Sequence, residues 1–389
     1  MVSESFAFDF QTAQRILFGS GLADRLGSLA AEYGHRALWI SINPRSYHQT
    51  LEQSLITAGI SFRMAVVQGE PKLGQILELV EQVKADQPEV VIATGGGSVM
   101  DCAKAVAALA VNPGDPLEYL EVVGKGKPLP VHPLPVIAVP TTAGTGSEVT
   151  RNAVISLPEH KVKVSLRSPK MLPAVALIDP SLTLDLPPIV TASTGMDALT
   201  QVIEPYVSNR ANVFTDLFCE GGIRKIAHSL RTAYHEGNTL WAREEMAFGS
   251  LMGGLALANA GLGAVHGFAA PLGGMFEAPH GAICARLLPV VSRVNILAVQ
   301  QRSPNHPVLE RYQRLAGWLV GDSGASIWQG VEWLENICEE FKIPRLRAYG
   351  IRKKDFSKVI EAARKASSMK ANPIELTDEE LLRILEESF

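Results

Sequence analysis

Hydrophobic residues in the first half of the chain fall into short, nearly continuous runs. These runs alternate with amphipathic helical stretches up to about residue 185, and they lie at residues 37–41, 64–67, 90–93, 136–139 and 175–178. Apolar runs of this length, each followed by a helical stretch, are typical of parallel strands that are buried on both faces. The pattern therefore predicts an α/β domain whose parallel sheet is covered by helices on both sides.

After Pro187 and Pro188 the pattern changes to the 3.6-residue period of helices. Clear examples are residues 216–234, 242–257 and 327–341. Thr377 and Glu380 have the spacing of a capping box and predict the start of the last helix. We therefore expect two domains, an α/β domain at residues 1–186 and an all-α domain at residues 187–389, with ligands in a cleft between them.

Composition and charge narrow the class of protein. The 389 residues are 47% hydrophobic and 20% charged, which is enough apolar material for a substantial core. A net charge of -4 with mixed signs offers no basic stripe for nucleic acid and no basic patch for a membrane. The sequence therefore predicts a globular protein whose partners are small molecules.

Location and redox state follow from the N-terminus and the cysteines. Residues 1–6 have neither the positive region nor the apolar region of a signal peptide, so we expect a cytoplasmic protein. The four cysteines lack C-x-x-C spacing, which favours reduced and mostly buried thiols. Residues 248–276 carry no Asp, Glu, Lys or Arg, but their Gly and Ala content favours a tightly packed central helix ending in a loop over a membrane span.

A glycine-rich turn follows the predicted strand at 90–93. It is built from Gly95, Gly96, Gly97 and Ser98, and the helix after it carries Asp101 in its first turns. Glycines let the backbone approach an anion closely, and a helix N-terminus offers free N–H groups and a favourable dipole. The turn predicts a site for the pyrophosphate of a dinucleotide. The alternative for Ser98 and Asp101 is a simple helix cap.

A second polar turn, residues 140–148, follows the next strand and is rich in hydroxyl groups. We expect it at the carboxyl edge of the sheet, where α/β proteins bind ligands. Its candidate cofactor-binding residues are Thr141, Thr142, Thr145 and Ser147. Lys163 is a candidate cation for the same ligand, with a solvated strand face as the alternative.

The second strand bears on the choice between NAD and NADP. NAD-preferring enzymes often end this strand with an acidic residue that binds the ribose hydroxyls. Residues 39–45 contain no acid, and Arg45 could meet a 2′-phosphate, which favours NADP; the alternative is an ordinary loop arginine.

The helical half contains a candidate metal site. His266 and His280 lie in a glycine-rich tract that is almost free of charge, and Asp197 lies far upstream with Gln201 four residues later on the same helical face. Two imidazoles and a carboxylate are costly to bury unless a partner such as a divalent cation neutralises the carboxylate. The alternative is a pair of hydrogen-bonded core histidines.

Together these motifs resemble the iron-containing (group III) alcohol dehydrogenase family, over nearly the whole chain. The motifs are Gly-Gly-Gly-Ser-x-x-Asp-x-x-Lys ending at Lys104, Pro-Thr-Thr-x-Gly-Thr-Gly-Ser-Glu ending at Glu148, Gly-Met-Asp-Ala-Leu-Thr ending at Thr200, and His266 with Pro-His-Gly ending at Gly281. The resemblance implies a Rossmann-like domain that binds NAD or NADP, followed by a helical domain of the dehydroquinate synthase-like fold that binds iron, zinc or another divalent ion. It places Asp197, His266 and His280 in the metal shell, and we expect a homodimer.

Two residues depart from the family pattern. Gln201 stands where most metal-dependent members have a histidine ligand, and Ala270 stands where a further histidine often assists proton movement. An amide oxygen is a weaker ligand than imidazole, so we expect weak and substoichiometric metal binding at Asp197, Gln201, His266 and His280.

The resemblance implies reversible hydride transfer between the nicotinamide and a small alcohol or carbonyl compound, assisted by the metal. Two alternatives stay open. In a metal-independent reductase like maleylacetate reductase, His266 or His280 would act as the catalytic hydrogen-bond donor. In a degenerate member, the chain would bind nucleotide without turnover.

Overall fold

The computed structural model describes residues 7–42, 45–160, 162–276 and 278–389. The chain divides into two compact units. One comprises Gln11–Asp185, and the other comprises Leu186–Phe389 together with residues 7–10. We call them the α/β unit and the helical unit.

The α/β unit is built on a six-stranded parallel sheet. Its strands are β1 (Arg15–Phe18), β2 (Arg36–Ser41), β3 (Ser61–Val66), β4 (Val90–Gly95), β5 (Val136–Pro140) and β8 (Val175–Ile178), in the order β1-β8-β5-β4-β2-β3. Every pair of neighbouring strands is parallel. All five predicted strands are present and the predicted sheet type is confirmed. The strand β1 was not predicted and is only four residues long.

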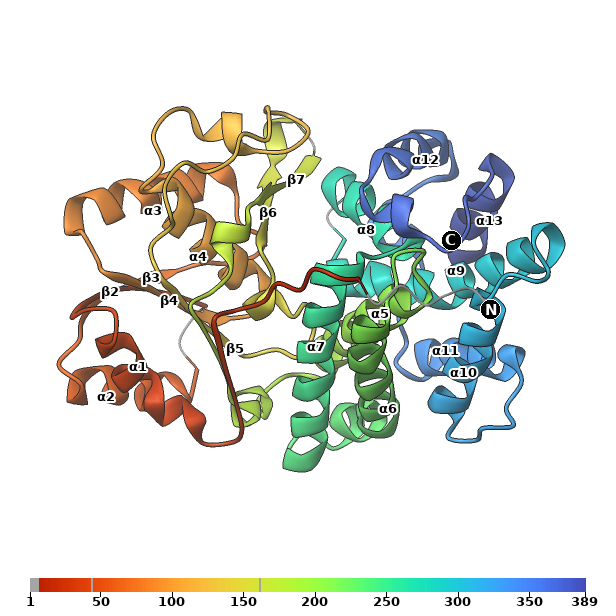
Figure 1. Ribbon diagram of the computed structural model, residues 1–389, viewed down its shortest axis with the longest axis horizontal. Coiled ribbons are helices and arrows are strands. Elements are labelled where there is room, and N and C mark those ends of the chain that lie inside the picture. Colours follow the sequence, from red (N-terminus) through yellow and green to blue (C-terminus); the bar gives the residue numbers. More distant parts are fainter. Residues whose placement is uncertain (1–6, 43–44, 161, 277) are drawn as a thin grey trace. The chain divides into compact units, whose positions relative to one another are not determined.

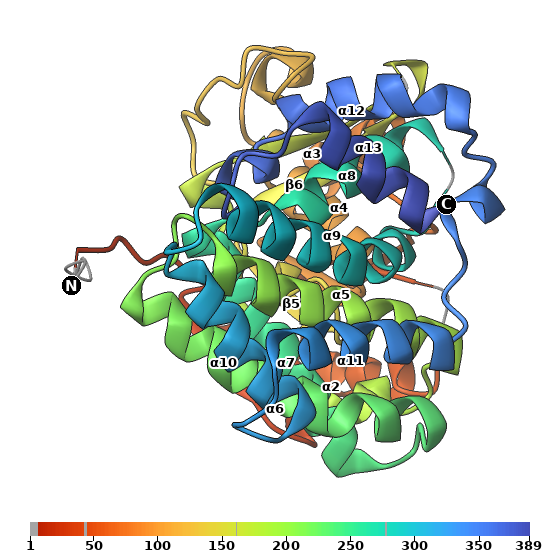
Figure 2. The ribbon, with the colours of Figure 1, turned by 90° about the vertical axis from the view of Figure 1, so that its right-hand side faces the viewer.

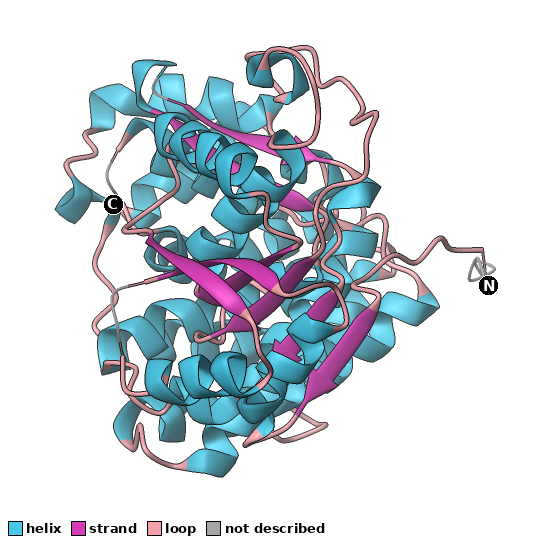
Figure 3. Cartoon of the chain, turned by 90° about the vertical axis from the view of Figure 1, so that its left-hand side faces the viewer, coloured by secondary structure: helices cyan, strands magenta, loops and turns pink. Residues whose placement is uncertain are grey.

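Helices cover both faces of this sheet (Figures 1 and 3). The helices α1 (Leu26–Ala31) and α2 (His48–Thr57) lie on one face, and α3 (Leu73–Asp86) and α4 (Gly97–Leu109) lie on the other. Successive side chains of a strand point to opposite faces. Accordingly, Trp39 packs into the core beneath α1 and α2, while Ile40 packs into the core beneath α3 and α4.

A separate antiparallel pair of strands was not predicted as such. It consists of β6 (Asn152–Leu157) and β7 (Val162–Arg167). Ala153, Ile155 and Leu157 alternate along β6 and join the core that contains α4. The pair is therefore held by packing against α4, a contact that the local sequence does not reveal.

The helical unit contains nine α-helices and, among the residues described after β8, no strand. They are α5 (Pro188–Val207), α6 (Val213–His235), α7 (Leu240–Ala260), α8 (Ala264–Met275), α9 (His280–Arg302), α10 (Val308–Val320), α11 (Ile327–Glu340), α12 (Phe356–Lys365) and α13 (Asp378–Ser388). The helices predicted at 216–234, 242–257 and 327–341 correspond to α6, α7 and α11. The predicted capping box forms, because the Glu380 N–H donates to Thr377 Oγ1 at 3.2 Å and the Thr377 N–H donates to Glu380 Oε2 at 2.8 Å.

Residues 7–10 lie with the helical unit, although the sequence placed them in the α/β domain. The reason is aromatic packing against α6. Phe8 stacks on Phe214 with ring centroids 4.8 Å apart, and Phe10 lies 5.5 Å from Phe218. For the rest of the chain, the boundary between the α/β unit and the helical unit lies between Asp185 and Leu186.

The uncharged stretch 248–276 differs from expectation in its second half. It does not end in a loop, because α8 follows α7 after a bend of 98°. The side chains of Val265, Phe268 and Leu272 are fully buried, which compensates for the poor helix propensity of the glycines and of Pro271.

One further helix, α9, is long and apolar enough by composition to cross a membrane. The most apolar part of α9 is 83% buried within the structure, as in the core helix of a globular protein. Figure 2 shows α9 running between α5 and α8, and both helices contact it.

Candidate functional site

The predicted phosphate turn lies at the point where the strand order of the sheet reverses. The chain proceeds from β2 outward to β3 and then returns to β4 on the other side of β2. In open α/β sheets, ligands bind beyond the carboxyl ends of the strands at such a switch point. Gly95 ends β4 and Gly97 begins α4 at this place, so the turn is positioned to bind a ligand.

The two predicted cofactor turns lie side by side. The Thr141 N–H donates to the Gly95 carbonyl at 2.9 Å. A Cβ atom at Gly96 would lie 3.2 Å from Thr142 Oγ1, and one at Gly97 would lie only 2.7 Å from Thr145 Cγ2. Glycine is therefore needed at position 97 for the close approach of the turns.

The helix cap considered for Ser98 and Asp101 does not form. The N-cap residue of α4 is Gly96, and no side chain caps the helix. Asp101 instead accepts hydrogen bonds from Ser147 Oγ at 2.6 Å and from the Val154 N–H at 2.9 Å. Its carboxylate thus ties α4 to the second polar turn and to β6.

Lys104 completes this connection and is almost fully buried. Its Nζ lies 3.3 Å from Asp101 Oδ1 and donates to the Ser147 carbonyl at 2.9 Å. Burial lowers the pKa of Lys104, against the opposing effect of Asp101. Burial also raises the pKa of the neighbouring Glu148 to about 7, although Lys104 opposes this rise. Asp101 and Lys104 thus connect α4 to the polar turn and fix the position of that turn.

The two predicted cations of the cofactor site have different surroundings. Arg45 is exposed after β2, next to residues 43–44, which lie outside the described residues. Its backbone N–H donates to His48 Nδ1 at 2.7 Å, and His48 Nε2 lies 2.7 Å from Ser41 Oγ, so a buried histidine holds this loop. Lys163, on β7, is partly buried, with 9% of its side chain exposed, and is paired with Glu70; the solvated strand face considered for it is therefore wrong.

In the helical unit, the structure brings together the three predicted metal ligands. Asp197 comes from α5, His266 from α8 and His280 from the first turn of α9. The Nε2 atoms of both histidines lie 3.6 Å from Asp197 Oδ1. This buried oxygen accepts no hydrogen bond from the described part of the chain, so it is available to a cation.

His280 is more exposed than Asp197 and His266. Its side chain is 38% exposed, whereas those of Asp197 and His266 are 3% and 8% exposed. Gly281 allows this arrangement, because a Cβ there would lie 2.4 Å from the Ser193 carbonyl oxygen of α5. The start of α9 can therefore approach α5 closely enough for His280 to face Asp197.

Gln201 lies beside Asp197, one helical turn further along α5. Its Nε2 donates to Asp197 Oδ2 at 3.0 Å. The amide thus holds one carboxylate oxygen and leaves Oδ1 facing the two imidazoles. Ala270, on α8, is exposed and has no group that could move a proton.

Glu204, which was not predicted as a site residue, orients His266. Glu204 Oε2 lies 2.6 Å from His266 Nδ1, and Oε1 accepts the Val265 N–H at 2.7 Å. A carboxylate on Nδ1 directs the lone pair of Nε2 to a metal. The spacing could have revealed it, because Asp197, Gln201 and Glu204 are separated by four and three residues and so share one helix face.

Cys284 was expected only to be one of four buried thiols, and it too belongs to the cluster. All four cysteines are buried and free, as expected. Cys284 Sγ, however, lies 3.6 Å from His280 Nε2 and 3.8 Å from His266 Nε2. One donor atom from each of Asp197, His266, His280 and Cys284 lies within 4.8 Å of the others.

The electrostatics of this cluster favour a cation. Burial opposes ionisation of Asp197, but the imidazoles of His280 and His266 hold its pKa below the usual range. Burial also opposes charging of the histidines, yet Cys284 and Asp197 raise the pKa of His280 to about 9 and that of His266 well above its ordinary value. The donors therefore attract positive charge, which a divalent ion can supply in place of protons.

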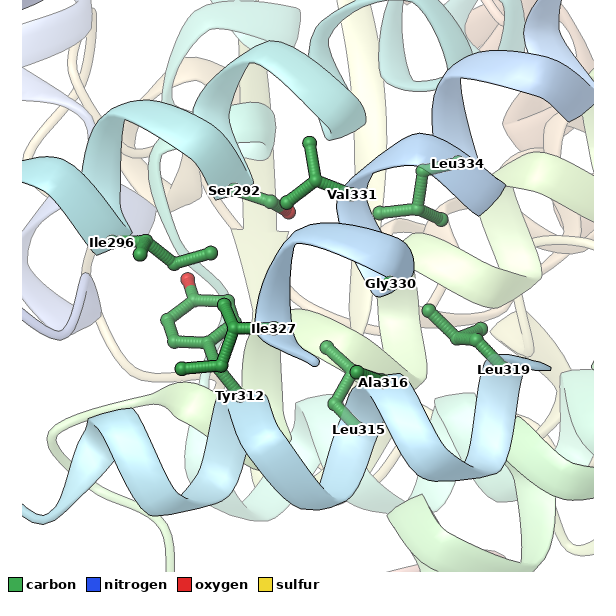
Figure 4. Close-up of a pocket in the computed structure, with 10 residues that line it drawn as sticks. All are labelled: Ser292, Ile296, Tyr312, Leu315, Ala316, Leu319, Ile327, Gly330, Val331 and Leu334. Atoms are coloured by element: carbon green, nitrogen blue, oxygen red, sulfur yellow. The ribbon is translucent and has the colours of Figure 1, made fainter. Parts of the chain in front are cut away.

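A pocket elsewhere in the helical unit is not a substrate site. It lies among α9, α10 and α11 and is lined mainly by apolar side chains such as Ile296, Leu315 and Leu334 (Figure 4). Its volume of about 10 Å³ holds no more than a single water molecule. None of the predicted site residues lines it.

The fold and the two candidate sites are those of a dehydrogenase, with a glycine turn suited to a dinucleotide on the α/β unit and side chains that could hold a metal ion in the helical unit. Residues 13–180 match the family described as iron-containing alcohol dehydrogenase, and residues 191–389 match the C-terminal part of the Fe-containing alcohol dehydrogenase family. The chain belongs to this family. It is an oxidoreductase that acts on CH–OH groups, and the family binds NAD(P) and iron or another divalent metal.

Individual relatives agree with this assignment. The chain is 36% identical to 1,3-propanediol dehydrogenase from Klebsiella pneumoniae, over 83% of this chain and 82% of that protein. It is 35% identical to alcohol dehydrogenase 4 of Saccharomyces cerevisiae, over 83% and 81%. Among solved structures, a 1,3-propanediol oxidoreductase superposes with a TM-score of 0.90 at 33% identity, covering 98% of this chain and 100% of the other. The sulfoacetaldehyde reductase of Bifidobacterium kashiwanohense, solved with NAD⁺, has a TM-score of 0.85 at 26% identity, over 99% of both chains.

Proposed function

We propose that this chain transfers hydride reversibly between nicotinamide C4 and the reacting carbon of a small alcohol or aldehyde, and that Asp197, His266 and His280 hold the assisting metal. The observation that carries this proposal is the convergence of Asp197 Oδ1 with two histidine Nε2 atoms, each 3.6 Å away. Residues in this arrangement fit a divalent ion, because the carboxylate oxygen is buried and accepts no hydrogen bond from the described residues.

An alcohol releases hydride readily only after its hydroxyl proton has left, so the site must stabilise negative charge on oxygen. A bound divalent metal supplies that stabilisation as a Lewis acid. Glu204 keeps the Nδ1 proton of His266 in place, and the partly exposed His280 lies where a substrate enters. Ala270 cannot relay the hydroxyl proton of the alcohol. The proton would therefore leave through water or through the ribose of the cofactor.

The relatives guide the choice of substrate. Their names include 1,3-propanediol dehydrogenase and, from Salmonella typhimurium, 1-propanol dehydrogenase PduQ. We propose short primary alcohols and diols, and the aldehydes derived from them, as the substrate class of this chain.

Turnover with and without metal tests the function directly. The protein is stripped with a chelator, reloaded with Fe²⁺ or Zn²⁺, and assayed with propanal, 1,3-propanediol and both nicotinamide cofactors. We expect activity to be lost on stripping and restored on reloading. Full activity after stripping would support the metal-independent reductase instead, and cofactor binding without turnover would support the degenerate nucleotide-binding protein.

We propose NADP(H) as the preferred cofactor, bound by Gly95, Gly96 and Gly97 and the polar turn, with Arg45 on the 2′-phosphate. Arg45 is exposed, follows β2 at the switch point, and has its backbone held by His48. Arg45→Ala should weaken NADPH binding by about tenfold, a typical loss for one charge-assisted contact, and leave NADH binding unchanged. Equal weakening of both cofactors, measured by fluorescence titration, would rule out this role.

We also propose a cytoplasmic homodimer. Four free cysteines suit a reducing compartment, as the sequence suggested. Light scattering of the purified protein and fractionation of the producing cells test the two parts separately.

A further inference from the structure

We propose that Cys284 is the fourth protein ligand of the metal centre, so that a carboxylate, two imidazoles and a thiolate hold the ion. This inference rests on the metal centre proposed above. It assigns a ligand that replaces the imidazole missing at position 201, and it changes the metal that the site prefers.

The distances agree with a tetrahedral site. With metal–nitrogen and metal–oxygen bonds of about 2.0–2.2 Å and a metal–sulfur bond of about 2.3 Å, a tetrahedron separates nitrogen from oxygen by about 3.4 Å and nitrogen from sulfur by about 3.6 Å. Both Nε2 atoms lie 3.6 Å from Asp197 Oδ1, and Cys284 Sγ lies 3.6 and 3.8 Å from them. These four distances lie within a few tenths of an ångström of the tetrahedral values, and the two remaining pairs of donor atoms lie within 4.8 Å.

The helix α9 supplies two of these donors. His280 is its first residue and Cys284 follows one turn later, so both side chains lie on the same face. Cys338 has a different environment, since its Sγ donates to the Ala285 carbonyl at 3.1 Å. Cys284 is the cysteine whose contacts in the described chain include two imidazoles.

Charge and chemistry also favour this set. The carboxylate of Asp197 and the thiolate of Cys284 together neutralise a divalent cation, which lowers the cost of burying it. Gln201 keeps its amide nitrogen on Asp197 Oδ2, as a residue that orients the carboxylate. A soft thiolate beside two imidazoles favours zinc, and its spectroscopic substitute Co²⁺, over the hard cations Mg²⁺ and Mn²⁺.

Substitution with Co²⁺ tests the assignment. A thiolate bound to Co²⁺ produces an intense charge-transfer absorption in the near ultraviolet, which carboxylate and imidazole ligands alone do not produce. We expect this band in the wild-type protein and in the control variant Cys338→Ala, which loses a buried thiol outside the site. Cys284→Ser, which is nearly isosteric, should lose the band and bind Zn²⁺ at least 10–100-fold more weakly in a chelator competition.

The outcomes separate this inference from the proposed function. Wild-type protein that binds one Co²⁺ without the band overturns the role of Cys284 and leaves the metal centre at Asp197, His266 and His280 standing. A band that persists in Cys284→Ser also overturns it. Wild-type protein that binds no Co²⁺ removes the metal centre itself. If Cys284→Ser fails to fold, Cys284→Ala is used in its place. Loss of the charge-transfer band relative to the wild-type spectrum then supports the role of Cys284, and persistence of the band overturns it.

Discussion

Replacing Glu204 by glutamine tests whether His266 is held in the form that binds metal. The Glu204 side chain is only 5% exposed, and each of its oxygens accepts one hydrogen bond: Oε2 from His266 Nδ1 at 2.6 Å and Oε1 from the Val265 N–H at 2.7 Å. Glutamine has nearly the same volume but offers one acceptor and one donor. The variant therefore changes the hydrogen bonding of the site and leaves its packing intact.

One orientation of the new amide keeps both hydrogen bonds, and the other loses one. If the amide NH₂ faces His266, Nδ1 must accept and the proton moves to Nε2, which can then no longer bind a metal. If the amide is turned round, its NH₂ meets the Val265 N–H and that buried donor is left without an acceptor. An unsatisfied buried group costs about 1–3 kcal/mol, so the amide should turn its NH₂ toward His266, and the free energy of unfolding of the metal-free protein should fall by less than that amount.

The Glu204→Gln variant should also bind Zn²⁺ more weakly than the wild type. Loss of the carboxylate that orients a ligand histidine typically costs 10–100-fold in metal affinity, or about 1.4–2.7 kcal/mol. Zn²⁺ affinity is measured by competition with a chromophoric chelator, and urea unfolding of the stripped protein reports stability.

Glu245→Gln is the matched control. Glu245 Oε2 lies 2.7 Å from His228 Nδ1, and this pair resembles the Glu204–His266 pair but includes a histidine that is 66% exposed, away from the cluster. The control should leave Zn²⁺ affinity unchanged. A Zn²⁺ affinity of Glu204→Gln within about twofold of the wild type would refute the orienting role of Glu204.

Three further predictions concern other groups. Lys104→Met leaves the Asp101 carboxylate without its buried cation and should lower the free energy of unfolding by about 3–5 kcal/mol in urea denaturation; a loss below about 1 kcal/mol would contradict this pairing. Glu148 has a pKa raised from 4.5 to about 7, so the folded state retains its proton more strongly than the unfolded state, and stability from this group declines as pH rises from about 4.5 through 7. As the pH is raised from 5 to 8, the wild type should therefore lose stability relative to Glu148→Gln, by at most about 3 kcal/mol of unfolding free energy. A stability difference that does not change with pH would show that the carboxyl titrates normally. Gln201→His removes the amide that donates to Asp197 Oδ2, and because Cys284 takes the fourth place in the proposed set of donors, Zn²⁺ affinity in chelator competition should not rise; a rise of about tenfold or more would show that an imidazole at position 201 joins the metal shell.

The sequence by itself determined most of the elements of this protein and most of the chemistry of its sites. Buried parallel strands need continuous apolar runs, and helices need a 3.6-residue period, so both are visible locally. The glycine turn after β4 and the capping box at Thr377 are equally local signals. The motifs also identified Asp197, His266 and His280 as members of one cluster, because the resemblance to a known family links residues that lie far apart in the chain.

Only the tertiary structure decided which side chains complete that cluster. Glu204 and Cys284 enter it because α5, α8 and α9 pack together, with the start of α9 close enough to α5 that a Cβ at Gly281 would lie 2.4 Å from the Ser193 carbonyl oxygen. Packing likewise made a helix of residues 264–275, since burial outweighs their poor helix propensity. The distances between elements depend on the packing of many side chains at once. A local pattern of residues therefore cannot predict these distances.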